Sequence, residues 1–278
     1  MELSQKETKK RSKGMKIHLL VIDPQKDFCD PSGALCVAGA DQDTIRLATM
    51  VDRLVSKIDD IHVTLDSHNE VDIAHPIFWV DSKGKHPGVF TIISANDVVK
   101  GVWTTTSPAC RQRAVDYVKA LEARNRNPLC VWPAHCIIGS EGHAIQSPLR
   151  ASLSNWERTR FKKVDFVTKG SNVFTEHYSA VQADVPDPSD PTTMLNTDLL
   201  NILANADVIL ISGQALSHCV KWTITDIADN FGEENIKKFI LLEDTCSNVT
   251  GFEKFGNDFV TEMTKRGMQK TKSTEYLS

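Results

Sequence analysis

The fold of this chain is decided by the stretch Val208-Ile209-Leu210-Ile211-Ser212-Gly213-Gln214-Ala215-Leu216-Ser217-His218-Cys219-Val220. It begins as an apolar strand and continues, from Val220 to about Asn230, as a helix. Cys219 lies at the start of that helix, where backbone N–H groups and the helix dipole favour a thiolate. The position suits a nucleophile, although a buried structural cysteine is the ordinary interpretation of an isolated Cys.

Strand-like and helix-like stretches alternate along the rest of the chain. We predict strands at 16–22, 61–65, 163–168, 207–212 and 238–242, and helices at 41–58, 194–204, 218–230 and 251–266. This alternation is typical of βαβ units, and it predicts an α/β fold with a parallel sheet.

Two further strand ends carry residues that can act together with Cys219. The apolar run at 19–22 ends in Asp23, and the run at 164–168 ends in Lys169. Ligand sites of open α/β sheets form at the carboxyl edge of the strands, so the three side chains can converge in one crevice. A carboxylate can take the thiol proton, and a nearby ammonium favours the thiolate. An Asp or Lys at a strand end is commonly an ordinary solvated residue. Only the three residues together, each after a separate strand, indicate a catalytic site.

A second group of residues offers donor atoms for a metal ion. The strand at 61–65 is followed by Asp66 and His68, and alternate residues of an extended segment point the same way. His75 follows, and His135 lies in the segment Trp132-Pro133-Ala134-His135-Cys136. Imidazole and carboxylate ligands suit zinc, iron or manganese and do not distinguish among them. Taken alone, His68 and His135 are more often ordinary polar surface residues.

These residues carry a resemblance to the isochorismatase-like cysteine hydrolases, and most of all to their nicotinamidase branch. The opening Asp-x-Gln-x-Asp-Phe motif of the family is matched by Asp23, Gln25, Asp27 and Phe28. Its lysine segment is matched by Lys169, Gly170, Tyr178 and Ser179, and its nucleophile segment by Gly213, Ala215, Cys219 and Val220. Ser217 stands where the family usually has Asp, and Lys26 where Asn is frequent. The resemblance implies a three-layer α/β/α fold with a mostly parallel sheet.

The resemblance also implies a reaction, the hydrolysis of nicotinamide to nicotinate and ammonia through a cysteine acyl-enzyme. In that reaction Asp23 is the general base, Lys169 stabilises the charges and Cys219 is the nucleophile. The backbone N–H groups of Ala215 and Cys219 form the oxyanion hole, and the Gln214–Ala215 peptide is expected to be cis.

The resemblance further implies one divalent metal ion per chain, zinc first, with iron or manganese as alternatives. Asp66, His68 and His135 match the family's ligands. His75 is the expected fourth ligand, although its spacing from His68 is one residue longer than in the common form, and His86 is its rival. The substrate pocket is expected to be lined by three aromatic residues, for which ordinary core packing is the alternative: Phe28, Trp132 and Tyr178.

Two other functions stay open at this point. One is a related cysteine hydrolase that acts on another small amide or an N-carbamoyl compound. The metal-ligand set argues against it, because those branches do not generally need a metal that binds a pyridine. The other is a non-catalytic protein with the same fold, against which the intact set of Asp23, Lys169 and Cys219 argues.

Composition agrees with a soluble cytoplasmic enzyme, and the resemblance implies a small-molecule amide as its partner. The chain has 278 residues, 41% of them hydrophobic, and a formal charge of −4. That length can bury one large core, and mild acidity argues against a nucleic-acid partner. No apolar run approaches the ~20 residues of a membrane span, and the start lacks the apolar core of a secretory signal. The 7 cysteines are scattered, which suits a reducing cytosol. A homo-oligomer stays open.

We predict a single domain at 15–278, which is preceded by a basic arm and interrupted by an insertion. Residues 1–14 are polar and basic, which predicts a disordered arm, with a targeting or nucleic-acid arm as the alternative. The stretch at about 76–128 is an insertion, longer than the usual α/β connection, with a strand-like run at 89–93 and a helix at 108–124. Because it lies between metal-ligand segments, we expect it to be folded and to border the site mouth. A lid, an oligomer contact and an embellishment are equal alternatives for its role.

Overall fold

A six-stranded parallel sheet forms the centre of the protein, in a computed structural model that describes residues 14–124 and 126–278. The strand order is β10-β9-β8-β1-β2-β7, and each neighbouring pair runs parallel. The strands are β1 (Ile17–Ile22), β2 (Asp60–Asp66), β7 (Asp165–Lys169), β8 (Val208–Gly213), β9 (Phe239–Leu242) and β10 (Gln269–Thr271). The predicted parallel α/β sheet is confirmed. The basic arm predicted at 1–14 lies outside the described residues, except for Gly14.

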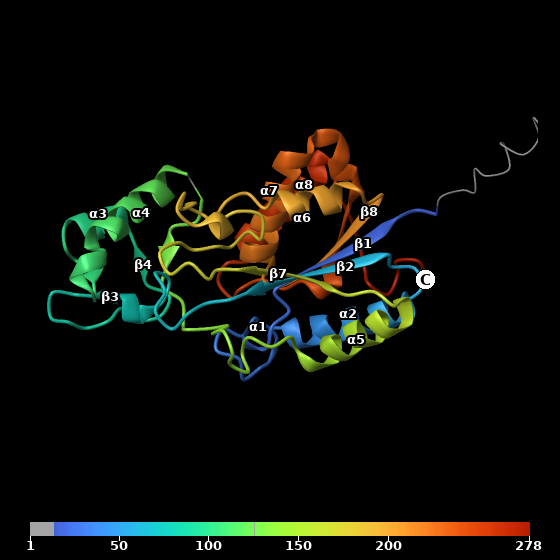
Figure 1. Cartoon of the computed structure of the whole chain (residues 1–278), viewed down its shortest axis with the longest axis horizontal. Helices are drawn as coiled ribbons and strands as arrows, with labels where there is room; N and C mark the ends of the chain where they lie inside the picture. The colour runs from blue at the N-terminus through green and yellow to red at the C-terminus, as the bar shows by residue number, and fades with distance from the viewer. Residues whose placement is uncertain (1–13, 125) are drawn as a thin grey trace, which may run out of the picture.

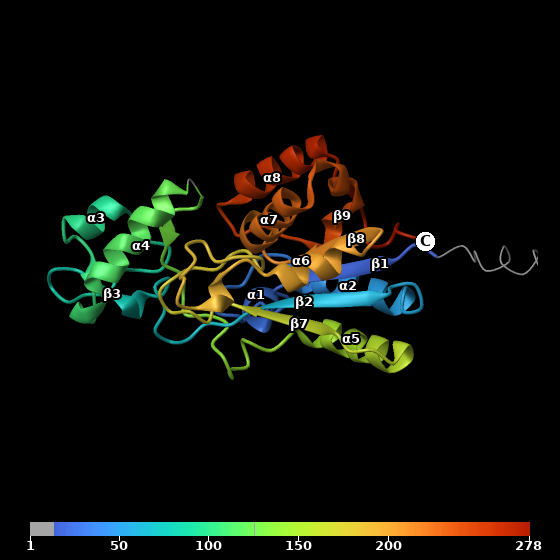
Figure 2. The same cartoon turned by 45° about the horizontal axis from the view of Figure 1, so that its top comes forward.

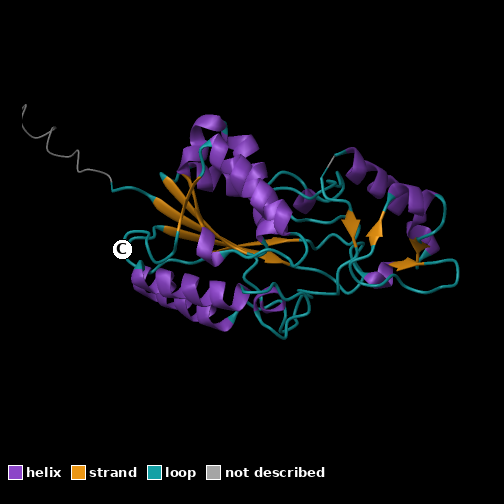
Figure 3. Ribbon diagram, turned by 180° about the vertical axis from the view of Figure 1, so that it is seen from behind, coloured by secondary structure: helices purple, strands orange, loops and turns teal. Residues whose placement is uncertain are grey.

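Helices cover both faces of this sheet and complete the three predicted layers (Figures 1 and 3). Alternate residues of β1 separate two cores: Leu19 and Val21 pack on the side of α2 and α5, and Leu20 and Ile22 pack on the side of α6, α7 and α8. Because β1 is buried on both faces, it is apolar at every position except His18, which is also buried. The helices are α2 (Ala40–Arg53), α5 (Ser147–Arg160), α6 (Thr197–Ala204), α7 (Lys221–Phe231) and α8 (Glu253–Arg266), with the short α1 (Lys26–Cys29) after β1.

Two helices differ from the sequence-based expectation. The helix predicted at 41–58 ends at Arg53, and the chain then turns so that the N–H groups of Lys57 and Ile58 both donate to the Leu54 carbonyl. Helix α5 was not predicted, although Leu149, Leu153 and Trp156 are buried and have helical spacing. In the described part of the chain, no helix has the length and hydrophobicity that crossing a membrane requires.

The insertion is a module with its own core, beyond the carboxyl ends of the strands (Figures 1 and 2). Two short antiparallel pairs brace it: β3 (Trp79–Val80) with β5 (Thr104–Thr105), and β4 (Ile92–Ile93) with β6 (Leu129–Cys130). The predicted strand at 89–93 is therefore only two residues long. The predicted helix at 108–124 is a 3-10 turn followed by α4 (Arg111–Ala123), which packs beside α3 (Ala95–Val99).

Candidate active and metal site

Three strand ends bring Asp23, Lys169 and Cys219 together at the carboxyl edge of the sheet. Asp23 follows β1, Lys169 closes β7, and Cys219 lies in a short π-helix, Leu216–Val220, between β8 and α7. The ammonium nitrogen of Lys169 is 2.9 Å from Asp23 Oδ2 and 3.6 Å from Cys219 Sγ. All three side chains are buried. Parallel strands place their carboxyl ends side by side, which explains how residues far apart in sequence meet here.

Burial sets the protonation states of this group. Desolvation raises the pKa of Cys219 well above its usual value, against the opposing effect of Lys169. Desolvation also raises the pKa of Asp23, and Lys169 again opposes it. Burial alone would lower the pKa of Lys169, but the carboxylates of Asp23 and Asp66 raise it well above normal. The resting site therefore holds a thiol, and the thiolate expected from the helix start has to be generated by proton transfer.

Thr64, which was not predicted, holds the carboxylate of Asp23. The backbone N–H of Asp23 donates to the Thr64 carbonyl and hydroxyl at 3.2 and 3.1 Å. The hydroxyl in turn donates to Asp23 Oδ1 at 2.5 Å. The other oxygen, Oδ2, is left for Lys169. Thr64 could have been predicted from its position in the sequence, because Thr64 and Asp66 are alternate residues of β2 and their side chains share a face.

Asp66, His68 and His135 form a buried group whose ligand atoms all lie within 4.8 Å of one another. The Nε2 atoms of His68 and His135 are 3.1 and 3.5 Å from Asp66 Oδ2. Each ring uses its Nδ1 elsewhere, His68 toward the Asp72 carboxylate at 3.0 Å and His135 toward the Pro133 carbonyl at 2.8 Å. Because those oxygens only accept, Nδ1 carries the proton and Nε2 is the atom available for a metal. The donor set fits a divalent cation.

The protonation of His68 shows what a cation would replace. Burial alone would lower the pKa of His68, but the carboxylates of Asp66 and Asp72 raise it well above normal. The ring is therefore an imidazolium between two carboxylates when Nε2 carries a proton. A metal ion held by His68 would supply positive charge in place of that proton.

His75 lies beside this group, and His86 does not join it. The ring of His75 is 5.2 Å from that of His68 and 5.6 Å from that of His135, centroid to centroid. Its Nδ1 faces the Glu70 carbonyl at 3.3 Å, and its buried Nε2 has no hydrogen-bond partner among the described residues. His86 instead makes a 2.7 Å hydrogen bond to the Trp79 carbonyl inside the insertion. Of the two rivals, His75 is the one that the structure places beside the donor group.

Gln25 and Asp27 tie the first motif to both metal-ligand segments. Gln25 Nε2 donates to the Asp66 carbonyl, and the Asp66 N–H donates to Gln25 Oε1, both at 2.7 Å. Asp27 Oδ2 accepts the N–H of Cys136, next to His135, at 2.6 Å. These contacts fix the two ligand segments against the loop that carries Asp23.

A small cavity beside Cys219 is lined by all three predicted aromatic residues, Phe28, Trp132 and Tyr178. The indole N–H of Trp132 donates to the Tyr178 hydroxyl at 2.9 Å, which fixes both rings. The ring of Phe28 meets that of His135 edge-on at 5.3 Å. The remaining lining residues are Leu35, Asp66, His135, Glu176, Ala215, His218, Cys219 and Val249. The cavity therefore brings the aromatic rings, the Cys219 thiol and two of the predicted metal ligands, Asp66 and His135, together in one lining.

Two titratable lining residues, Glu176 and His218, were not predicted. Burial raises the pKa of Glu176 to about 8, and its Oε2 has no hydrogen-bond partner in the described part of the chain. Burial lowers the pKa of His218 to about 3, so this imidazole is neutral. Glu176 lies between the motif residues Lys169 and Tyr178, and His218 precedes Cys219. A comparison that considers only the fixed positions of a motif does not find residues that lie between those positions.

The turn before Cys219 has the features expected of an oxyanion hole. The Gln214–Ala215 peptide is cis, as expected. The N–H of Ala215 makes no hydrogen bond to protein groups within the described ranges, and Ala215 lines the cavity together with Cys219. Ser217 does not cap a helix; its hydroxyl accepts the Val249 N–H at 3.1 Å and lies 2.9 Å from His218 Nδ1.

The insertion contacts two walls of the cavity. The ring of Phe90 meets that of Trp132 edge-on at 5.7 Å, and Phe90 is 48% exposed. The Tyr117 hydroxyl, from α4, accepts the N–H of Glu176 at 3.1 Å. The module therefore supports the site mouth through Trp132 and Glu176.

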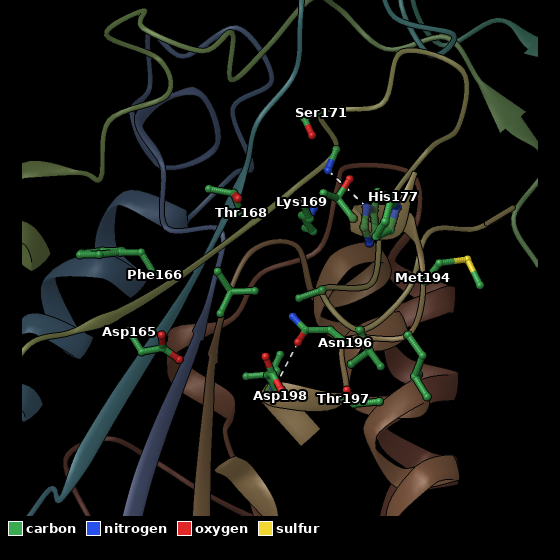
Figure 4. Close-up of a pocket in the computed structure, with 18 of the residues that line it drawn as sticks. Asp165, Phe166, Thr168, Lys169, Ser171, His177, Met194, Asn196, Thr197 and Asp198 are labelled. Atoms are coloured by element: carbon green, nitrogen blue, oxygen red, sulfur yellow. Dashed lines mark hydrogen bonds between the residues drawn. The ribbon is translucent and has the colours of Figure 1, made fainter. Parts of the chain in front are cut away.

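A larger groove, of about 480 Å³, lies between β7 and α6 (Figure 4). Asp165 and Asp198 lie along it, and near its upper end the Gly170 N–H donates to His177 Nδ1 at 3.3 Å. Although Lys169 borders this groove, its ammonium contacts Asp23 and Asp66 instead. Cys219, the predicted nucleophile, lines the smaller cavity and not this groove.

Comparisons with known proteins show the fold. No protein-family model matches the chain, and no curated protein matches it in sequence. The structure of a nicotinamidase/pyrazinamidase from Acinetobacter baumanii matches with a TM-score of 0.64 at 19% identity, over 95% of this chain and 99% of that one. The yeast nicotinamidase Pnc1p matches with a TM-score of 0.61 at 19% identity, over 92% and 99%. A zinc complex of the Pyrococcus horikoshii pyrazinamidase gives 0.54 at 18% identity, over 92% and 99%. The chain has the α/β fold of these enzymes, which confirms the predicted three-layer α/β/α architecture.

Proposed function

We propose that this protein is a nicotinamidase, which hydrolyses nicotinamide to nicotinate and ammonia in NAD salvage. One observation carries the proposal: the Lys169 ammonium is 2.9 Å from Asp23 and 3.0 Å from Asp66. The predicted hydrolytic group and the predicted metal-ligand group are therefore in direct contact, and Cys219, Asp66 and His135 line the same cavity. A flat substrate with a carboxamide on one side and a ring nitrogen on the other matches that arrangement. The three structures compared above carry the names nicotinamidase or pyrazinamidase, which supports the same substrate class for this chain.

The first half of the reaction forms the acyl-enzyme. Asp23 takes the proton of Cys219 as the sulfur attacks the carboxamide carbon, and the carbonyl electron pair moves to oxygen. The N–H groups of Ala215 and Cys219 stabilise that oxyanion, which is often the largest electrostatic contribution in such reactions. Lys169 stabilises the ionised Asp23 and the thiolate. Asp23 then gives its proton to the amide nitrogen, the C–N bond breaks, and ammonia leaves.

The second half releases the acid. Asp23 takes a proton from water as the water oxygen attacks the thioester carbon. The tetrahedral intermediate collapses with breakage of the C–S bond, and the sulfur of Cys219 regains a proton from Asp23. The product leaves as the acid and becomes nicotinate by giving its proton to the released ammonia or to water. Through both halves Thr64 keeps one carboxylate oxygen of Asp23 occupied, so proton transfer uses the other.

Asp66, His68, His135 and His75 would hold the metal ion. When bound, the ion supplies a Lewis acid for the pyridine nitrogen and thereby orients the ring. We propose zinc, on the strength of the zinc complex with the same fold, and iron or manganese also suit these donors. As part of the same proposal, the enzyme acts in the cytoplasm on a free small molecule, without a nucleic-acid or membrane partner.

Ammonia release from nicotinamide by the purified protein tests this proposal. We expect turnover by the wild type, none by Cys219→Ala, and loss of wild-type activity after chelation with recovery on zinc addition. Nicotinamide left intact by metal-loaded wild type would show that the proposed function is wrong. Rapid turnover of an N-carbamoyl amine in the same assay would then favour the alternative hydrolase.

A further inference from the structure

The segment that carries Ala215 is anchored on both sides by residues outside the cavity. Gln214 is 1% exposed; its Nε2 donates to Asp43 Oδ2 at 2.9 Å, and its Oε1 accepts the Ser247 N–H at 3.1 Å. On the other side of Ala215, the Leu216 N–H donates to the Ser247 carbonyl at 2.8 Å. Ala215 therefore lies between two residues that are both tied to Ser247.

Asp43, in the first turn of α2, is the centre of this network. It is 3% exposed, and its Oδ2 also accepts the Ser247 hydroxyl at 2.6 Å. Its Oδ1 pairs with the Arg46 guanidinium at 2.6 Å, and Arg46 Nε donates to the Asp244 carbonyl at 2.6 Å. A buried carboxylate is tolerated only where hydrogen bonds satisfy its oxygens, and here three side chains do so. The network therefore links α2, the turn after β8 and the segment after β9.

We propose that Asp43, Gln214 and Ser247 are positioning residues that aim the N–H of Ala215 at the reacting carbonyl oxygen. The inference rests on the proposed function, because it concerns the oxyanion of that reaction. None of the three lines the catalytic cavity, so their influence passes through the Ala215 backbone. An oxyanion donor is effective only when it is preorganised, and a misplacement of about 1 Å costs on the order of 100-fold in rate.

A purely structural role is the rival explanation, and an aldehyde probe separates the two. With pyridine-3-carbaldehyde, the Cys219 sulfur adds to the carbonyl carbon, the π pair moves to oxygen, and the thiol proton passes to Asp23. The adduct carries the oxyanion but has no leaving group. A matched ligand, 3-methylpyridine, has the same ring and no carbonyl oxygen, so its binding does not depend on the Ala215 N–H.

Gln214→Met is the main variant, because methionine fills a similar volume without hydrogen bonding. We expect the inhibition constant of the aldehyde to rise, and kcat for nicotinamide to fall, by roughly 10- to 100-fold, as for a displaced oxyanion donor. The inhibition constant of 3-methylpyridine should change by less than about twofold, since this ligand makes no use of oxyanion stabilisation. Asp43→Asn should act in the same direction, and the double variant should be little worse than either single one, because both break one contact.

Thr44→Val is the matched control. Thr44 is buried on α2 next to Asp43, and its hydroxyl donates to the Ala40 carbonyl at 2.7 Å without touching Gln214 or Ser247. The control should lower the melting temperature and leave the ratio of the two inhibition constants unchanged. If Gln214→Met fails to fold, Asp43→Asn and Ser247→Ala provide the same comparison. Variants that lose stability but keep the wild-type ratio would overturn the positioning role alone. A wild type that neither hydrolyses nicotinamide nor binds the aldehyde would overturn the proposed function and this inference together.

Discussion

Replacing Lys169 by methionine should destabilise the protein strongly and in a pH-dependent way. The Lys169 ammonium is buried and contacts the carboxylates of both Asp23 and Asp66. Removing one partner of a buried ion pair typically costs about 3–5 kcal/mol, because the remaining charge is left uncompensated. In the variant, the carboxylate of Asp66 would still have a bound metal ion as a cationic neighbour. The carboxylate of Asp23 would have no cationic neighbour. We therefore expect a loss of about 3–5 kcal/mol of unfolding free energy at pH 8.

The pKa of Asp23 determines whether the stability loss of the Lys169→Met variant grows or shrinks as the pH rises. Burial already raises the pKa of Asp23, and Lys169 opposes that rise, so the Lys169→Met variant should have a still higher Asp23 pKa. A carboxyl group whose folded pKa lies above its unfolded value contributes stability at low pH and loses it as pH rises through the folded pKa. The variant should therefore lie closer to wild type at pH 5 than at pH 8.

Urea unfolding at the two pH values measures this difference. Lys221→Met is the matched control, since Lys221 is part-buried against Trp222 and Phe255 and has no carboxylate within salt-bridge distance among the described residues. The control should lose no more than about 1 kcal/mol, with little pH dependence. A Lys169→Met protein as stable as wild type at pH 8, or equally destabilised at both pH values, would refute the reasoning.

Other predictions concern the remaining site residues. Cys219→Ala should abolish ammonia release with an unchanged circular dichroism spectrum, and retained turnover would exclude the acyl-enzyme. Asp23→Asn should lower kcat by about 10²–10⁴-fold, as expected for a lost general base, and pre-steady-state kinetics should show no acyl-enzyme burst. His68→Ala should lose most of the roughly one metal ion per chain that elemental analysis is expected to find in wild type; unchanged content would contradict the ligand assignment. Phe90→Ala should raise KM for nicotinamide a few-fold with kcat nearly unchanged, because Phe90 supports Trp132 without touching the thiol.

The central fold could be predicted because the strands that form it are locally distinctive. The apolar runs that became β1 and β8 are buried along their whole length, and such runs stand out in a sequence. Helix α5 was missed although Leu149, Leu153 and Trp156 have helical spacing, because polar residues dominate the segment and no motif marks it. Apart from β4, which lies in the predicted run at 89–93, the two-residue strands of the insertion have no local pattern, since they form only where the module closes on its own core.

The candidate site was predictable to the extent that topology determines it. Lys169 ends a parallel strand, and Asp23 and Cys219 follow the ends of two others; because parallel strands end at one edge, their convergence follows from the fold. Glu176 and His218 lie between motif positions and become notable only when burial is known. The contact between Asp43 and Gln214 joins residues 171 positions apart, and it depends on how α2 packs against the turn after β8. Tertiary contacts of that kind have no local sequence signal.

The most direct test of the account compares kcat/KM for nicotinamide and benzamide on the metal-loaded enzyme. The two amides have the same reacting group and nearly the same shape, and they differ in the ring nitrogen that the metal is proposed to bind. Leaving a site group without its partner costs at least about 2 kcal/mol, so benzamide should be roughly 30-fold worse or more. Benzamide turned over as efficiently as nicotinamide would contradict the claim that the metal and the thiol act on one substrate in one cavity.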